Sequence, residues 1–205
     1  MNYDTLASAD SINKVIETLK VHNIEAELVG DRAAALAKVQ ELIPAGASVM
    51  NGSSRTLEEI GFIEYLKEGK HGWNNLHATI AEEKDPAEQT RLRRQALFAD
   101  YYLGSVHAAT ETGELIIASA SGSQLASLVS TSPNIVLVSG AQKITPTLEE
   151  GLKRLREYVF PLEDARMKAL GYQGSLLAKI VILAKEHSMM GRKVRLLLVN
   201  EKLGF

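Results

Sequence analysis

Residues 104–125 read GSVHAATETGELIIASASGSQL, and the pattern of this stretch determines the fold expected around it. Two apolar runs flank the polar turn Thr110-Glu111-Thr112-Gly113-Glu114, as in two strands joined by a tight turn. The second run passes into the small-residue loop Ser119-Ala120-Ser121-Gly122-Ser123-Gln124, which precedes a helix-compatible segment. Backbone N–H groups at such a loop can meet an anion. The stretch therefore predicts a carboxylate, a histidine and an anion-binding loop close together.

Helical and extended patterns alternate on the N-terminal side of this stretch. Apolar residues recur at helical spacing over 12–19, 31–42 and from 56 onward, and strand patterns cover 24–29 and 47–50. On the C-terminal side, residues 134–138 (NIVLV) form a nearly continuous apolar run, which is typical of a central strand covered on both faces. This order predicts an α/β fold with a mostly parallel sheet flanked by helices.

Three regions complete the predicted fold. Residues 61–100 form a helical excursion from the sheet, either a cap over a site or an interface. Strands are expected at 101–108 and 115–118 and a helix at 125–129, followed by a helix that starts at Thr147, passes Tyr158 and is interrupted by Pro161. Strands at 179–184 and 194–199 form a C-terminal pair, joined by a hairpin loop at 187–193.

The composition indicates one ordinary globular domain that spans residues 1–205. The chain is 45% hydrophobic and 23% charged, with a formal net charge of −2, so a large nucleic-acid footprint is not expected. The basic cluster at 91–94 follows several acids and is interpreted as a solvated helix face. No signal peptide or membrane-spanning run is evident, so a cytoplasmic location with no membrane partner is expected.

The sequence contains no cysteine, which excludes disulfides, thiolate catalysis and cysteine-ligated iron–sulfur clusters for this chain. The histidines show neither HxH nor HExxH spacing, so no metal site and no cofactor are predicted.

Two residues are candidates for catalysis. Glu111, in the polar turn, is either a solvated surface acid or an acid, base or nucleophile at the lip of a cleft. His107 is either a structural histidine or a group for ligand contact and proton transfer.

The candidate ligand-binding residues come from three segments that follow strands. Ser121, Gly122, Ser123 and Gln124 either cap a helix or bind an anion at the same N–H groups. The loop of Asn51, Gly52, Ser53 and Ser54 also lies between a strand and a helix, so the same two alternatives apply to it. It is followed by Arg55, which can hold a carboxylate or phosphate. Lys143 is either an ordinary surface lysine or a residue that forms a cationic wall of a ligand-binding crevice. Loops at the carboxyl ends of parallel strands would face one crevice, the usual ligand location in such sheets.

Five ordered blocks of the sequence together resemble the LUD domain, the family of the lactate-utilisation C-type protein. They are SSRTLEEIG (53–61), SVHAATETGELIIASASGSQL (105–125), VSGAQKI (138–144), YVFPLEDAR (158–166) and VNEKLGF (199–205). The resemblance implies the fold of ribose-5-phosphate isomerase, glucosamine-6-phosphate deaminase, CoA transferases and 5-formyltetrahydrofolate cyclo-ligase. It also implies that Glu111 and the loop 121–124 are counterparts of the catalytic acid and ligand-binding loop in those relatives. The isomerase's lysine-and-glycine loop is absent, because 119–124 contains no lysine, and the cyclo-ligase nucleotide loop is not recognisable.

Two functions are compatible with this resemblance. The first is a crevice formed by 51–55, Glu111 and 121–124 that takes an anionic small metabolite of carboxylate, phosphate, CoA or folate type. The second is a non-catalytic accessory subunit of a lactate-oxidation system whose partners hold iron–sulfur clusters. The remaining alternative is a homo-oligomeric protein whose remnant site binds nothing specific.

Overall fold

A computed structural model describes residues 2–205 and contains a six-stranded main sheet. In spatial order its strands are β1 (Glu25–Val29), β10 (Lys193–Val199), β7 (Asn134–Gly140), β4 (Tyr101–Ser105), β2 (Ser48–Asn51) and β3 (Asn74–Asn75). All neighbouring strands in this sheet are parallel. The predicted α/β fold with a mostly parallel sheet is therefore confirmed.

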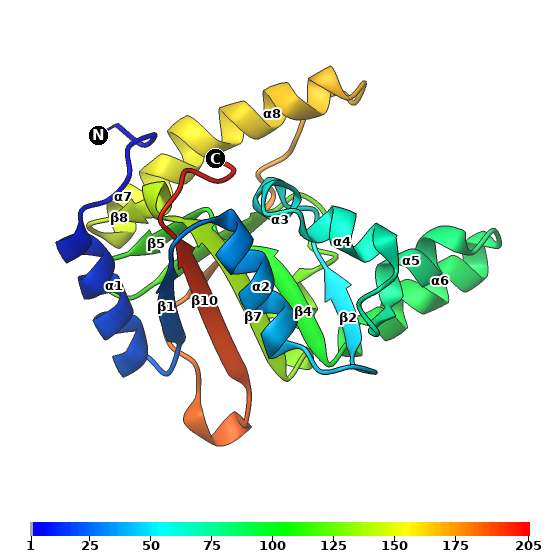
Figure 1. The fold of residues 1–205 in the computed structure, drawn as a ribbon. Helices are drawn as coiled ribbons and strands as arrows, with labels where there is room; N and C mark the ends of the chain where they lie inside the picture. Colours follow the sequence, from blue (N-terminus) through cyan, green and yellow to red (C-terminus); the bar gives the residue numbers. More distant parts are fainter. Residues whose placement is uncertain (1) are drawn as a thin grey trace.

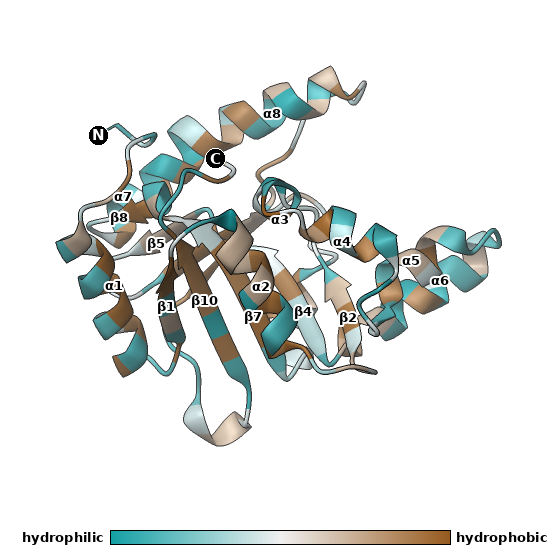
Figure 2. Cartoon of the chain, in the orientation of Figure 1, coloured by the Kyte–Doolittle hydropathy of each residue, from teal (hydrophilic) through white to brown (hydrophobic). Residues whose placement is uncertain are grey.

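The central strand β7 is buried on both faces, as its continuous apolar run predicts. Ile135 and Leu137 join the apolar cluster on one face, whereas Val136 and Val138 join the cluster on the other. Because side chains alternate along a strand, an unbroken apolar run serves two cores at once. Figure 2 shows the resulting concentration of hydrophobic residues in the middle of the sheet.

Helices cover both faces of the main sheet. The helices on one face are α2 (Arg32–Leu42), α3 (Arg55–Glu59) and α4 (Phe62–Glu68), and the other face packs against α1 (Ala9–Val21). Figure 1 shows α2 in front of the sheet, running roughly along β10 and β7, and α1 beside the edge formed by β1. Within residues 2–205, no helix has the length and apolar character needed to cross a membrane.

A second, smaller sheet packs on the α1 side of the main sheet. Its strands, in spatial order, are β8 (Ile144–Thr145), β5 (Ala108–Thr110), β6 (Leu115–Ser119) and β9 (Lys179–Leu183). The predicted strand 101–108 is therefore two strands in two sheets, because the chain leaves the main sheet after Ser105 and enters the small sheet at Ala108. The predicted turn at 110–114 is present, and β5 and β6 pair antiparallel on either side of it.

The predicted C-terminal strand pair is wrong. Strand β9 pairs antiparallel with β6 in the small sheet, whereas β10 lies between β1 and β7 in the main sheet. The segment 187–193 is therefore a connection between sheets rather than a hairpin loop, and it contains the short 3-10 helix η5 (Ser188–Met190). Both runs have the composition of a strand, but strand composition does not specify the pairing partner.

The predicted interruption at Pro161 is also wrong. The helix α7 (Leu148–Arg154) continues through a π-helical turn, η4 (Leu155–Val159), directly into α8 (Phe160–Ala169). Pro161 lies in the first turn of α8, where its missing N–H group is tolerated because the wider π turn has already broken the regular hydrogen-bond ladder. Figure 1 shows α8 running across the end of the main sheet.

The excursion at 61–100 is mostly helical, as predicted. After α4 it contains α5 (Leu76–Glu82), α6 (Pro86–Gln95) and the 3-10 turn η1 (Ala96–Phe98), and it also contributes the short edge strand β3. Asp85 caps α6 through the Ala87 N–H group, with Pro86 in the first turn. Its helices α5 and α6 lie beyond the β2 edge of the sheet (Figure 1).

Candidate functional site

A cavity of about 390 Å³ lies where β4 of the main sheet ends beside β6 of the small sheet. Its walls come from both predicted loops, from the segment 105–107, from α8 and from residues 175–177. Gly52, Ser53, Arg55, Ser121, Ser123, Gln124, His107 and Lys143 all line it. The structure therefore brings most of the predicted site residues together. The excursion 61–100 contributes no lining residue, so the cover over this cavity is α8 rather than that excursion.

The two predicted loops touch each other directly at Gly52. A Cβ atom added there would lie 2.0 Å from Gln124 Oε1 and 2.7 Å from the Tyr102 hydroxyl oxygen. Only glycine leaves room for this approach, so Gly52 sets the closeness of the two walls. Asn51 lies just outside the lining; its side-chain amide donates to the Gly52 carbonyl at 3.2 Å.

Serine hydroxyls cap several N–H groups in these loops. Ser119 Oγ accepts from the Gly122 N–H at 2.9 Å, and Ser121 Oγ accepts from the Ser123 N–H at 3.2 Å. Ser54 Oγ caps α3 through the Leu57 N–H in the same way. These N–H groups are therefore already bonded to capping hydroxyls. Attraction of an anion to the cavity depends on side chains instead.

Lys143 is a buried cation at the cavity wall, only 3% exposed. Its Nζ atom donates to Thr56 Oγ1 at 2.9 Å, to Ser105 Oγ at 3.2 Å and to the Val106 carbonyl at 3.3 Å. Within residues 2–205, no carboxylate forms an ion pair with this amine. Burial, followed by repulsion from Arg154, lowers the pKa of Lys143 to about 7.

His107 borders the same cavity in its neutral form. Its Nδ1 atom accepts a hydrogen bond from the Ala118 N–H at 3.0 Å, so the proton of the neutral ring resides on Nε2. Burial, followed by repulsion from Lys143 and Arg154, lowers the pKa of His107 to about 3. His107 is therefore a hydrogen-bond donor at neutral pH rather than a proton carrier. Within residues 2–205, no cluster of three or more histidine and acidic side chains is placed to hold a metal ion.

Arg154, which the sequence analysis did not identify, is a second buried cation. It is fully buried, and its Nη1 atom donates to the His107 carbonyl. Its guanidinium lies over the Tyr158 ring, with Cζ 5.3 Å from the ring centroid. Its Nε and Nη2 atoms have no partner among the described residues. Burial lowers the pKa of Arg154 to about 10. Helical spacing in the sequence could have identified Arg154 as buried, because Gly151, Arg154 and Leu155 fall on the same face of the helix and that face is buried.

Glu111 lies away from the cavity. Its carboxylate accepts hydrogen bonds from Ser11 Oγ and from Lys14 Nζ, the latter at 2.9 Å, and it is not among the lining residues. These two hydrogen bonds hold the pKa of Glu111 below its usual value. The predicted crevice therefore does not include Glu111, whose ionised carboxylate ties the turn 110–114 to α1.

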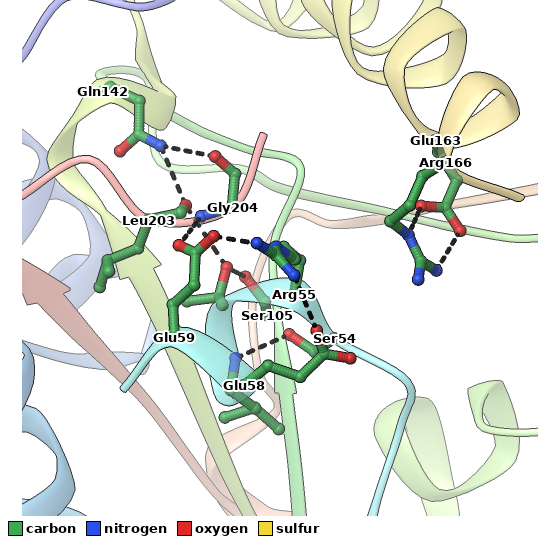
Figure 3. Close-up of polar contacts among 12 residues, drawn as sticks. Ser54, Arg55, Glu58, Glu59, Ser105, Gln142, Glu163, Arg166, Leu203 and Gly204 are labelled. Carbon is green, nitrogen blue, oxygen red and sulfur yellow. Dashed lines mark hydrogen bonds and ion pairs between the residues drawn. The ribbon is translucent and has the colours of Figure 1, made fainter. Parts of the chain in front are cut away.

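The arginines at the cavity, unlike Lys143, are paired with acids. Arg55 donates to Glu59 at 3.0 Å and to Glu58 at 3.4 Å, and Glu59 also accepts from the Gly204 N–H at 2.7 Å (Figure 3). On α8, Arg166 forms two hydrogen bonds to the carboxylate of the residue three positions earlier, at 2.8 and 2.9 Å. The positive charge left uncompensated in the lining is therefore that of Lys143.

Comparison with known proteins agrees with this architecture. The sequence profile described as the LUD domain matches residues 12–173. A crystal structure of a DUF162 family protein from Deinococcus radiodurans superposes with a TM-score of 0.55 at 15% sequence identity, over 95% of this chain and 98% of that chain. At this identity the likeness shows the fold alone. No curated protein matches the sequence.

Proposed function

The chain belongs to the LUD domain family, and from this premise we propose that its cavity binds a small anionic metabolite. Family membership supplies the fold but no ligand. The proposal rests on one observation, namely that Lys143 is a buried cation without an acidic partner among residues 2–205.

Burying a cation without a counter-charge is costly. The neutral oxygens around Lys143 Nζ compensate this cost only in part, since burial still lowers the pKa of the amine. A carboxylate or phosphate in the cavity would supply the missing negative charge in a low-dielectric setting, where such a pair is stronger than in water. The neutral His107 ring offers a further donor at Nε2 to the same ligand.

The size and lining of the cavity favour a compact ligand. A volume of about 390 Å³ lies at the lower end of the usual range for small-molecule sites. The lining contains several serines and also the apolar side chains of Leu137, Leu155, Phe160 and Leu176. A carboxylate or phosphate with a short carbon skeleton suits both kinds of lining residue.

Binding can be tested by a thermal-shift and calorimetry screen of sugar phosphates, 2-hydroxy acids, 2-oxo acids and folates. A ligand present at a hundredfold excess over its Kd should stabilise the native chain by about 2.7 kcal/mol. We expect Lys143→Met to weaken an anionic ligand at least about tenfold, the effect of losing one charge-assisted contact of about 1.4 kcal/mol or more. Lys20→Met, a change of the same type at an exposed position on α1, is the matched control and should leave Kd unchanged.

Two results would count against the proposal. One is that no anionic compound binds the wild-type chain at millimolar concentration. The other is that Lys143→Met binds the same anion as tightly as the wild-type chain does, because the uncompensated charge would then play no part.

A further inference from the structure

We propose that the Lys143 amine is a nucleophile that forms an imine with a carbonyl group of the bound metabolite. The inference rests on the proposed function and narrows the ligand to an anionic carbonyl compound, with either a carboxylate or a phosphate as its anion.

The hydrogen bonds around Lys143 suit both an ammonium and a neutral amine. A carboxylate partner would hold the ammonium charged, but the acceptors here are two hydroxyls and a carbonyl. A hydroxyl both donates and accepts, so it can adjust to the loss of a proton from Nζ. Each hydroxyl also has a carbonyl acceptor for its own proton. Thr56 Oγ1 donates to the Leu203 carbonyl at 3.4 Å, and Ser105 Oγ donates to the Val106 carbonyl at 3.3 Å.

Charged and titratable groups from several elements influence this amine. Arg154 from α7 repels the ammonium, Glu59 from α3 stabilises it, and burial opposes it most strongly, so the pKa is about 7. Repulsion from the ammonium in turn helps to keep His107 neutral. A substantial fraction of Lys143 is therefore an unprotonated amine at neutral pH, the form that attacks a carbonyl carbon.

Gly204 packs closely against the amine at the cavity wall because it has no side chain. A Cβ atom added at Gly204 would lie 3.1 Å from Lys143 Nζ and 2.6 Å from Thr56 Oγ1. Both Gly204 and Lys143 line the cavity. Glycine at position 204 therefore lets this segment border the amine without displacing Lys143 or Thr56, and Lys143 remains a lining residue of the cavity.

The reaction balances without an oxidant or reductant. The nitrogen lone pair attacks the carbonyl carbon, a C–N bond forms, and the carbonyl π electrons move to oxygen. Proton transfer from nitrogen to oxygen gives a carbinolamine. The nitrogen lone pair then expels the oxygen, which leaves as water after protonation, and a protonated imine remains. The net change is carbonyl compound plus neutral amine plus one proton taken up from solvent to protonated imine plus water.

Reductive trapping tests this chemistry on the wild-type chain. The protein is incubated with cyanoborohydride and either pyruvate or dihydroxyacetone phosphate, which distinguishes a carboxylate from a phosphate anion. Dihydroxyacetone, which carries no anion, serves as the control ligand. Intact mass and peptide mapping then locate the adduct. We expect one secondary amine at Lys143 with an anionic probe, formed at least about tenfold faster than at exposed lysines because more of its amine is neutral.

Two further readouts sharpen the result. The trapping rate should rise with pH through about 7, since the amine must lose its proton before it attacks. Lys143→Arg keeps a cation for the anion but cannot form the imine, so it should bind the probe without an adduct. The mapping on the wild-type chain does not depend on how this variant folds.

The proposal and the function beneath it fail in different ways. If calorimetry shows that an anionic probe binds but no adduct forms at Lys143, the imine is refuted and anion binding stands. If neither probe binds nor reacts, the imine is refuted, and if no anionic compound of the wider screen binds either, the proposed function is refuted with it. An adduct spread equally over exposed lysines, or formed as fast in the heat-unfolded chain, refutes the imine as a property of this site.

Discussion

Replacement of Lys143 by methionine should change how the stability of the protein depends on pH. Methionine is unbranched and similar in length, so the substitution removes the charge while filling most of the space. The hydroxyls of Thr56 and Ser105 retain other partners in the variant, because each also bonds to a backbone carbonyl. The comparison between the two chains therefore isolates the protonation of one buried amine.

The magnitude follows from the pKa of this amine. In the unfolded chain a lysine titrates near its ordinary value of 10.5, whereas in the folded chain Lys143 titrates at about 7. Between these values the unfolded chain binds more protons, so the free energy of unfolding rises with pH by about 1.4 kcal/mol per pH unit. Below about pH 7 the cost of the buried ammonium is fully present, and it corresponds to about 5 kcal/mol.

Urea unfolding of the wild-type chain and of Lys143→Met measures this effect. From about pH 6 to about pH 9, the difference in unfolding free energy should move by about 3 kcal/mol in favour of the wild-type chain. Lys20→Met, at an exposed position, controls for the loss of a lysine as such. A difference that stays flat across this range would refute the assignment of a depressed pKa. A difference that moves in favour of the variant over this range would refute it as well.

Three further changes test the framework that holds the cavity. Trp73→Phe should destabilise the chain by about 1–3 kcal/mol in urea unfolding followed by circular dichroism, because the indole N–H donates to a buried carbonyl. Asp100→Asn should lower the free energy of unfolding by about 1 kcal/mol at neutral pH, since this exposed carboxylate accepts two hydrogen bonds from Ser48. These bonds also lower the pKa of Asp100, so the difference from wild type should disappear when unfolding is measured below about pH 4. Gly52→Ala should lower the melting temperature by displacing Gln124, and adding Gln124→Ala should restore part of the loss.

Much of the element order could be predicted from local pattern. The alternation of α1, β1, α2 and β2 and the doubly buried strand β7 follow from apolar periodicity. The pairing of strands could not be predicted in the same way. Strands β9 and β10 have similar composition, yet they belong to different sheets, because pairing depends on which edge each strand reaches in the folded chain.

The candidate site, like the fold, could be predicted from the sequence only in part. Placement of both small-residue loops at one cavity agrees with their position after strands, which sequence shows. Glu111 was expected at that cavity because it is near in sequence, but its carboxylate turns to Lys14 on α1. Arg154 belongs to no sequence motif, and what distinguishes it is full burial without an acidic partner among residues 2–205.

By itself, the sequence determined the helices, most strands, the buried faces and the loops able to line a crevice, because hydrophobic periodicity and capping act over a few residues. Only the tertiary structure decided which sheet each strand joins and which charged groups lie without partners. Lys143 is ordinary in sequence, and its contacts with Thr56, 87 positions away, and with Ser105, 38 positions away, exist only after the ends of β4 and β7 and the helix α3 come together. That packing removes water from the amine, and no residue within 2–205 supplies an acid that forms an ion pair with it, which is the physical origin of the chemistry proposed for the cavity.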